Sequence, residues 1–278
     1  MKLCVNYLME LRELIPEGKI DYIDYIKLYS IDGDLSPFDW CRSQREVMFH
    51  GYVGHGSNIA DADFLERRDN DEQRDYFKRA NTPYVSTHIN RSFEDPATEE
   101  EVTERIKNNI QFLKDEFGMR VILENVPYHP KKAYNKFMVM PEYIKNSVYE
   151  NDCGFLFDIG HARAAAERLD IPFDEYVARL PMDKLVEIHL AGSMKTKSGG
   201  ITPNHSKMHE EDYEFLEWAI QNCPTLETIT LEYGPIDQTE TIEETPYASA
   251  TEINPQIKDE IVEQLDRIYE IMKKYNLK

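Results

Sequence analysis

Side chains of the kinds that bind metals recur at nearly constant spacing through this chain of 278 residues. Six of them each end a short segment rich in β-forming residues: His50 in VMFHG, His88 in YVSTH, Glu124 in VILEN, Asp158 in FLFDIGH, His189 in VEIHL and Glu232 in TITLEY. The successive gaps are 38, 36, 34, 31 and 43 residues, and a strand, a helix and their two connections need about that length. The spacing therefore predicts a repeated βα unit.

A closed barrel of such units brings the carboxyl ends of all its strands to one face, where six separate side chains can meet. Strand interiors of α/β proteins are buried on both faces, so a charged or imidazole group among them must be paired, hydrogen-bonded or bound to metal. For any one of the six, an ordinary polar residue at a strand end is the simpler interpretation. Six in the same position favour one metal centre of three histidines and three carboxylates.

The length suits one α/β barrel, which typically takes about 250 residues. Eight strands are expected, at residues 2–7, 25–30, 47–51, 84–89, 120–125, 153–161, 185–192 and 228–233. Helical patterns separate most of them, and the clearest begins with a capping box at Thr98 and Glu101 and stops at Gly118. Because no change of composition marks a boundary, the sequence predicts an α/β protein with a (β/α)8 TIM barrel as a single domain over residues 1–278.

The charge and the apolar pattern exclude several classes of partner. The 32 Lys and Arg against 52 Asp and Glu give a net charge of -20, which repels phosphate backbones, so no nucleic acid is expected. No run approaches the roughly 18 apolar residues of a membrane span, and the first residues do not resemble a signal peptide. The four cysteines are scattered without a CxxC motif and are expected to be reduced. A cytoplasmic protein that binds no membrane is expected.

Two further histidines extend the candidate metal set to eight residues. His161 lies three residues after Asp158, and His205 lies in the loop after the seventh strand. Histidine and carboxylate ligands without cysteine suit Fe, Mn or Zn, and a mixed set favours a catalytic centre with several ions. Glu124 is expected to bridge two of them. The remaining histidines are expected to be loop residues or hydrogen-bond donors: His55, His129 and His209.

At these residues the sequence resembles the xylose-isomerase-like barrel superfamily and, within it, the multinuclear non-heme iron-dependent oxidative enzymes. The similar segments are FHGYVGHGSNIAD, VSTH, LENVPY, EIHLAG and TLEYG, in the family's order. The resemblance implies an oxidoreductase that uses two iron ions, or three, and dioxygen to modify a peptide, commonly at cysteine, as a ribosomal natural product matures. Glu124, Asp158 and Glu232 would be catalytic, and a small partner protein would present the peptide.

Two segments depart from the family pattern. DIGH at residues 158–161 replaces the family's Asp-x-Asn-Asn and is more similar to the DxxHA of endonuclease IV. PNH at residues 203–205 stands where both groups have Asp-x-His. Because proline offers no side-chain ligand, a third metal site keeps His161 and His205 but lacks its carboxylate. Two ions are expected, with a third only where Asn204, His209 or solvent completes the site.

Three other functions stay open. A sugar or sugar-phosphate isomerase or epimerase would use one Mn or Mg ion at four of the six residues and leave His50 and His88 without a role. An enzyme of the endonuclease IV type would use three Zn ions on phosphodiesters, which the net charge of -20 and Pro203 disfavour. A non-catalytic protein would hold tightly caged Zn or no metal.

Overall fold

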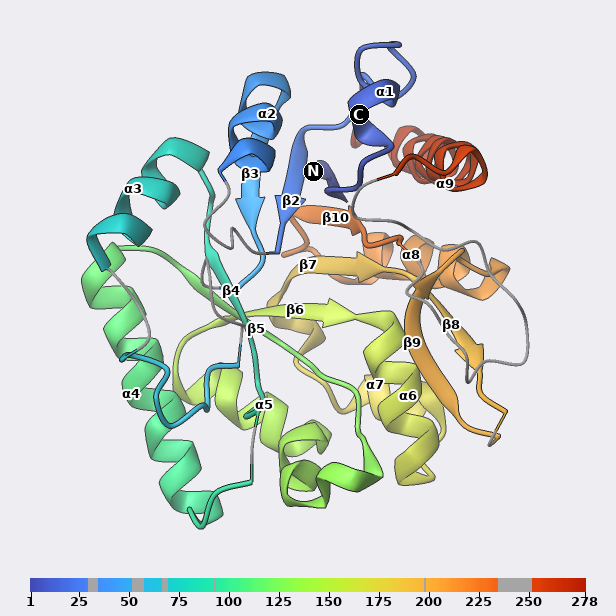
Figure 1. The fold of residues 1–278 in the computed structure, drawn as a ribbon. Coiled ribbons are helices and arrows are strands. Elements are labelled where there is room, and N and C mark those ends of the chain that lie inside the picture. The colour runs from blue at the N-terminus through green and yellow to red at the C-terminus, as the bar shows by residue number, and fades with distance from the viewer. Residues whose placement is uncertain (30–34, 52–57, 67–69, 93, 198, 235–251) are drawn as a thin grey trace.

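The computed structural model describes residues 1–29, 35–51, 58–66, 70–92, 94–197, 199–234 and 252–278. Eight parallel strands curl into a nearly closed barrel, as predicted, and each overlaps one of the expected segments (Figure 1). They are β1 (Lys2–Asn6), β2 (Tyr25–Leu28), β3 (Glu46–Phe49), β4 (Val85–His88), β5 (Val121–Glu124), β6 (Gly154–Asp158), β7 (Leu185–Leu190) and β10 (Thr228–Leu231).

Helices surround the strands on the outside (Figure 1). They are α1 (Leu11–Leu14), α2 (Ser36–Gln44), α3 (Asn70–Ala80), α4 (Glu99–Phe117), α5 (Pro141–Glu150), α6 (Ile159–Leu169), α7 (Phe173–Ala178), α8 (Glu210–Asn222) and α9 (Pro255–Lys274), with 3-10 helices η1 (Pro130–Val139) and η2 (Met182–Lys184). The capping box predicted for α4 is confirmed, because Thr98 accepts a hydrogen bond from the Glu101 amide and Glu101 accepts one from the Thr98 amide. Gly118 ends this helix in the left-handed conformation, with φ of 62°.

The strands follow the order β3-β2-β1-β10-β7-β6-β5-β4 around the barrel. Within the described residues, no ladder of backbone hydrogen bonds joins β3 to β4 at the two ends of this order. The Ser86 side chain bridges them instead, since its Oγ donates to the carbonyl of Phe49 at 3.3 Å and accepts from the amide of Gly51 at 3.3 Å. We refer to this junction of β3 and β4 as the seam.

Alternate strand residues point into the barrel, as the two-residue period of a strand requires. A buried apolar layer closes the interior and consists of Cys4, Met48, Tyr84, Ile122, Leu156 and Val186. Several predicted ligands lie two residues beyond a member of this layer, as His50 does after Met48 and Glu124 after Ile122. The same period therefore carries them one layer further toward the carboxyl ends of the strands.

Two expectations about element boundaries are wrong. The strand predicted at residues 153–161 ends at Asp158, because the Asp158 carboxylate accepts a hydrogen bond from the His161 amide at 2.6 Å and starts helix α6. His161 therefore lies in the first turn of a helix. The long segment after the seventh strand is an antiparallel hairpin of β8 (Gly192–Lys195) and β9 (Ile201–Ser206) rather than a loop. A second long loop, which the sequence predicts over residues 234–253, lies almost wholly outside the described residues.

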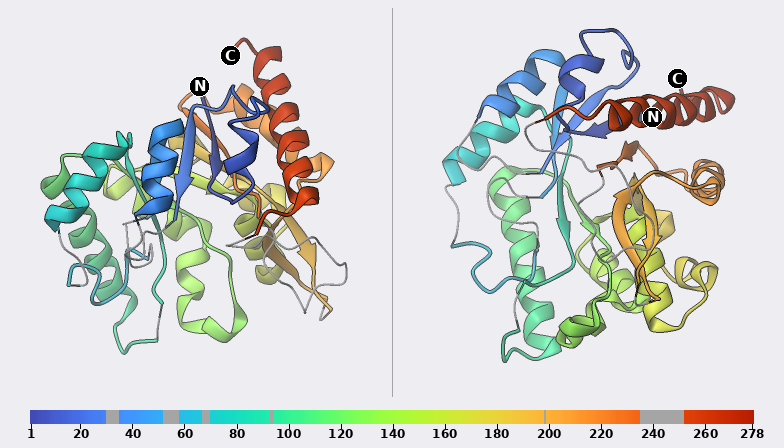
Figure 2. Two further views of the ribbon diagram at one scale, coloured as in Figure 1. Left: turned by 45° about the horizontal axis from the view of Figure 1, so that its top comes forward. Right: turned by 45° about the vertical axis from the view of Figure 1, so that its right-hand side comes forward.

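The two ends of the chain lie near each other beside α9 (Figure 2). Lys278 forms an ion pair with Asp24, just before β2. All four cysteines are buried and free of disulfides. Among the described residues, no helix is both long and apolar enough to span a membrane.

Candidate metal centre

The six strand-end residues converge at the carboxyl ends of the strands. Ladder register places His88 beside Glu124 and Asp158 beside His189. His50 directly follows β3, and Glu232 directly follows β10. Five of the six are buried, and His88 is partly exposed with 21% of its side chain accessible.

Glu124 and two histidines form the first group of candidate ligand atoms. Glu124 Oε2 lies 3.4 Å from His50 Nε2 and 3.2 Å from His88 Nε2, and the two histidine nitrogens are 3.2 Å apart. Ligand atoms about 2.1 Å from one ion lie roughly 3.0 Å apart in an octahedron and roughly 3.4 Å apart in a tetrahedron. These three atoms are therefore spaced like one face of a metal's coordination shell.

The second group lies on the other side of the same carboxylate. Glu124 Oε1 is 3.3 Å from His161 Nδ1 and 3.8 Å from His189 Nδ1. His189 Nδ1 is in turn 3.0 Å from Glu232 Oε2 and 3.9 Å from Asp158 Oδ2. Glu124 thus turns one oxygen toward each group, which is the arrangement that a bridging carboxylate needs.

Several of these buried atoms have no hydrogen-bond partner. They are both carboxylate oxygens of Glu124, Oδ2 of Asp158, Oε2 of Glu232 and Nδ1 of His189. An unpaired buried carboxylate oxygen is costly, and a cation shared among such atoms removes the cost. Three overlapping groups of these side chains could each hold an ion: His50 with Glu124 and His189, Glu124 with Asp158 and His161, and Asp158 with His189 and Glu232. The residues present therefore fit a metal centre.

The carboxylates of the site differ in their affinity for protons. Burial raises the pKa of Asp158 to about 6, against the opposing charge of His161. Burial would also raise the pKa of Glu124, but the neighbouring His88 and His50 outweigh it and hold that pKa well below its usual value. Glu124 therefore stays ionised in this surrounding.

The histidines divide in the same way. Burial lowers the pKa of His50 to about 3, so this imidazole is neutral and ready to bind a cation. Burial opposes the protonation of His161 and His189 as well, but Asp158 raises the pKa of His161 to about 9, and Glu232 raises that of His189 to about 10. These two histidines hold protons that balance the buried carboxylates, and a bound metal would replace those protons.

His205 lies at the edge of the centre. Its Nδ1 is 3.1 Å from the Glu232 carbonyl oxygen and 3.8 Å from Oε2 of the same residue. Its backbone is left-handed, with φ of 52°. The adjacent Asn204 is buried, and neither polar atom of its side chain has a hydrogen-bond partner.

The histidines expected to lie outside the metal set have other partners. His129 accepts a hydrogen bond from the Lys131 amide and caps η1. His209 precedes α8, and its Nε2 lies 3.1 Å from the Ser193 carbonyl oxygen. His55 lies outside the described residues.

Three side chains at or below the centre were not predicted from the sequence. The Tyr29 hydroxyl, just past β2, donates to the Glu232 carboxylate, and its ring meets His50 edge-on with centroids 5.0 Å apart. Lys27 and Glu187 form a fully buried ion pair beneath His189. The available signal was a charged residue inside each of the strand segments YIKL and LVEIHL.

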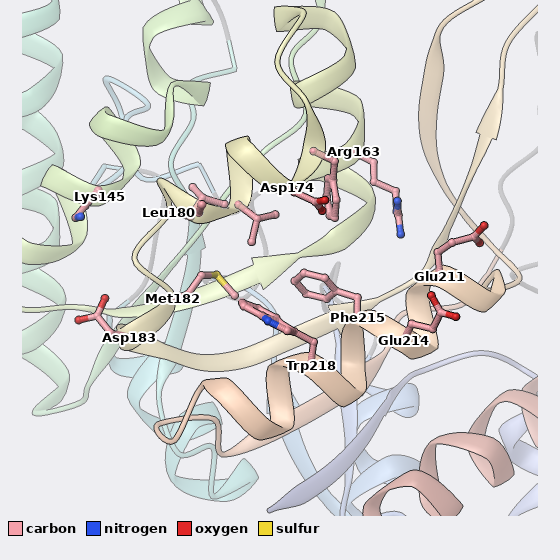
Figure 3. Close-up of a pocket in the computed structure, with 13 residues that line it drawn as sticks. Lys145, Arg163, Asp174, Leu180, Met182, Asp183, Glu211, Glu214, Phe215 and Trp218 are labelled. Carbon is pink, nitrogen blue, oxygen red and sulfur yellow. The ribbon is translucent and has the colours of Figure 1, made fainter.

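A groove of about 940 Å³ lies on the outer wall of the barrel, away from this centre. Figure 3 shows Phe215 and Trp218 of α8 facing it, with Asp174 of α7 and Leu180 on the opposite side. None of the eight candidate ligands lines it. The groove is therefore separate from the candidate metal centre.

Comparison with known sequences gives a family match over most of the chain. A profile of the family described as RiPP precursor modification enzyme MbnB/TglH/ChrH matches residues 32–242. A UPF0276 protein of Chromobacterium violaceum is 27% identical over 135 residues, 47% of this chain and 48% of that protein. The chain thus spans about half the length of this curated relative.

Solved structures share the fold at low sequence identity. A xylose isomerase domain-containing protein of Salmonella typhimurium LT2 matches with a TM-score of 0.59 and 10% identity, over 98% of this chain and 97% of that one. Endonuclease IV from Thermus thermophilus matches with a TM-score of 0.57 and 14% identity, over 99% of this chain and 100% of that one. The barrel is therefore xylose-isomerase-like.

Proposed function

Because this chain belongs to the MbnB/TglH/ChrH family of RiPP precursor modification enzymes, we propose that it is a multinuclear non-heme iron oxidase. In this proposal it uses dioxygen to modify a peptide, at cysteine, during the maturation of a ribosomally made natural product. The proposal rests on the surroundings of Glu124. Its two carboxylate oxygens have no hydrogen-bond partner, and they face two separate groups of histidines and carboxylates.

We assign one iron to His50, His88 and Glu124, and a second to Glu124, Asp158, His189 and Glu232. His161 and His205 stand beside the second group and are the candidates for a third ion. When bound, iron supplies the redox chemistry and the open coordination positions that dioxygen and a thiolate need. Zinc would hold the same ligands without any redox chemistry.

The chain's own residues would control orientation and protons around the metals. Asn125 exchanges two hydrogen bonds of 2.9 Å with the backbone of Asp158 and so fixes β5 to β6 at the site. Tyr29 is partly exposed, and its hydroxyl donates to the buried Glu232 carboxylate. We infer that it orients the peptide or carries a proton to it.

The proposed partners are the peptide substrate and a small protein that presents it. A net charge of -20 favours a basic peptide and disfavours nucleic acid as the substrate. A one-metal isomerase would not need the histidines that follow β3 and end β4. Their presence therefore favours a centre with more than one metal.

The test is oxygen uptake by protein loaded with ferrous iron under anaerobic conditions. Iron-loaded protein should consume dioxygen when its cysteine-containing precursor peptide is added, and protein loaded with Zn or Mg should not. Elemental analysis should find at least two iron ions per chain. Turnover of a ketose with Mn or Mg, without oxygen uptake, would establish the isomerase instead.

A further inference from the structure

We propose that the buried ion pair of Lys27 and Glu187 is the positioning element for His189, holding its ring so that Nδ1 faces the metal centre. The inference rests on the proposed function, in which His189 is a ligand of the second iron. Lys27 comes from β2 and Glu187 from β7, so the pair spans the barrel interior below the site.

The three side chains meet at the ring nitrogen that faces away from the centre. Lys27 Nζ lies 2.5 Å from Glu187 Oε1 and 2.7 Å from His189 Nε2. Glu187 Oε1 is itself 3.3 Å from that nitrogen. All three residues are 0% exposed. One nitrogen of the ring is thus held by the pair while the other points at the candidate ligands.

Glu187 is fixed by further bonds and cannot turn away. Tyr84 donates its hydroxyl to Oε2 at 3.0 Å, and Thr230 donates to Oε1 at 2.5 Å. With Lys27, these contacts tie the carboxylate to residues from three other parts of the barrel wall.

The pair offers both kinds of partner to one nitrogen. An ammonium group can only donate a hydrogen bond, and a carboxylate can only accept one. When a metal takes Nδ1, the ring proton lies on Nε2, and that N–H donates to the Glu187 carboxylate 3.3 Å away, which Lys27 holds in place. Such partners fix the ring orientation of a ligating histidine, and their loss typically costs about 10-fold to 100-fold in metal affinity.

Stability alone does not account for an ion pair at this place. Apolar side chains of similar volume often replace a buried ion pair with no loss of stability, whereas removal of one partner leaves an uncompensated charge. This contrast supplies the experiment. Lys27→Met and Glu187→Met alone should each lower the melting temperature, and the double variant should recover part of that loss.

In the double variant, the affinity for metal should stay low even though part of the melting temperature is recovered. The double variant should bind one of its two iron ions about 10-fold to 100-fold more weakly. Mössbauer spectra of the iron-loaded protein should change for the iron at His189 and stay unchanged for the iron at His50 and His88. A folded double variant with wild-type affinity for both ions and an unchanged spectrum would overturn the inference.

Two further variants keep the test decisive. Thr230→Val removes one hydroxyl that supports Glu187 with little change of shape, and it should weaken the same iron several-fold even where the double variant does not fold; unchanged affinity would count against the inference. Arg91→Met is the control, because Arg91 is a buried cation paired with Asp95 and touches none of the candidate ligands. It should lower the melting temperature and leave both metals in place.

His189→Ala separates this inference from the proposed function. If that variant loses one iron while the double variant keeps both at full affinity, His189 is a ligand and only the positioning role is wrong. If His189→Ala itself keeps both ions at wild-type affinity, the ligand assignment is wrong, and the positioning role falls with it.

Discussion

Glu124 turns one carboxylate oxygen toward each of the two groups of candidate ligands. An amide in its place keeps one weakly basic oxygen and loses the negative charge, so it cannot bridge two cations. Glu124→Gln should therefore lose at least one of two metal equivalents per chain, together with most of the activity. Elemental analysis of the purified protein measures this directly.

The matched control is a buried glutamate elsewhere in the barrel. Glu10 is buried, accepts a hydrogen bond from the Asn254 amide at 2.9 Å and lies outside the groups of side chains that could hold an ion. Glu10→Gln should keep both metal equivalents. If Glu124→Gln also keeps both but is inactive, Glu124 contacts the substrate and does not bridge the metals.

Proton release at the metal centre gives a second expectation for single residues. In the metal-free protein the pKa of His161 is raised to about 9 and that of His189 to about 10, so both are protonated at neutral pH. Bound metal should displace both protons, from His189 as a ligand and from His161 as a positive charge beside the ligands Glu124 and Asp158, and its affinity should rise by about tenfold per pH unit for each proton displaced. Titration calorimetry in buffers of different ionisation enthalpy counts the protons.

His161→Gln should release one proton fewer than the wild-type protein and show a shallower dependence on pH. Metal affinity should increase with pH, because fewer protons then compete with the metal. The increase should end once the pH exceeds the raised pKa values. An affinity that falls as pH rises from about 6 to about 8 would contradict this account of the site.

The strand-end position was enough to predict from the sequence that six side chains meet. Tyr29, Lys27 and Glu187 were missed for a physical reason. Lys27 and Glu187 are 160 residues apart and become neighbours only across a closed barrel. No local pattern shows which charged residues of two distant strands face each other.

Among the elements, the β8–β9 hairpin carries the residues on which a third ion would depend. Pro203 of β9 packs closely on α6, since a Cβ added at Gly160 would lie 3.3 Å from the Pro203 Cβ. Pro203→Asp keeps a side chain of modest size and restores a carboxylate near His205. Metal content should rise from two toward three ions per chain, measured by elemental analysis after anaerobic loading.

Pro203→Asn is the control, because it has a similar shape without the charge and should leave the metal content unchanged. Three fully occupied ions in the wild-type protein would show that another group already completes the third shell. Asn204, buried and without a hydrogen-bond partner, would then be the first side chain to test.

The strands and helix α4 could be predicted because apolar periodicity and a capping box are local signals. The end of β6 could not be predicted, since apolar residues recur beyond Asp158, at Ile159 and Ala162 of α6. There, one hydrogen bond from the His161 amide to Asp158 decides where the helix starts. The hairpin strands could not be predicted, because their residues do not alternate between apolar and polar. The hairpin instead packs against α6, which is distant from it in the sequence.

At the scale of the whole molecule, we expect a metal at the seam to couple metal binding to barrel closure. His50 follows β3 and His88 ends β4, so an ion bound by both joins the two strands that lack a backbone ladder. Removal of the metal should speed amide hydrogen exchange at Gly51 and in β4 more than in β7 and β10. Mass spectrometry of the metal-free and metal-loaded protein measures the difference.

Ser86→Ala provides the control, because it removes the side-chain hydrogen bonds that join β3 to β4. Exchange at the seam should then depend on metal more strongly than in the wild-type protein. An equal change in all eight strands would mean that the metal stabilises the fold as a whole and not this junction.

The seam and the closeness of residues 1 and 278 together indicate where a circular permutation of this chain should be tolerated. Within the described residues, seven junctions of the barrel have strand ladders, and at the eighth the Ser86 side chain joins β3 to β4. A circular permutant that joins residue 278 to residue 1 and opens between β3 and α3 would preserve every ladder of the described sheet. Its two new ends would leave the Ser86 hydrogen bonds, and a metal held by His50 and His88, as the links between the first and last strands of the new chain.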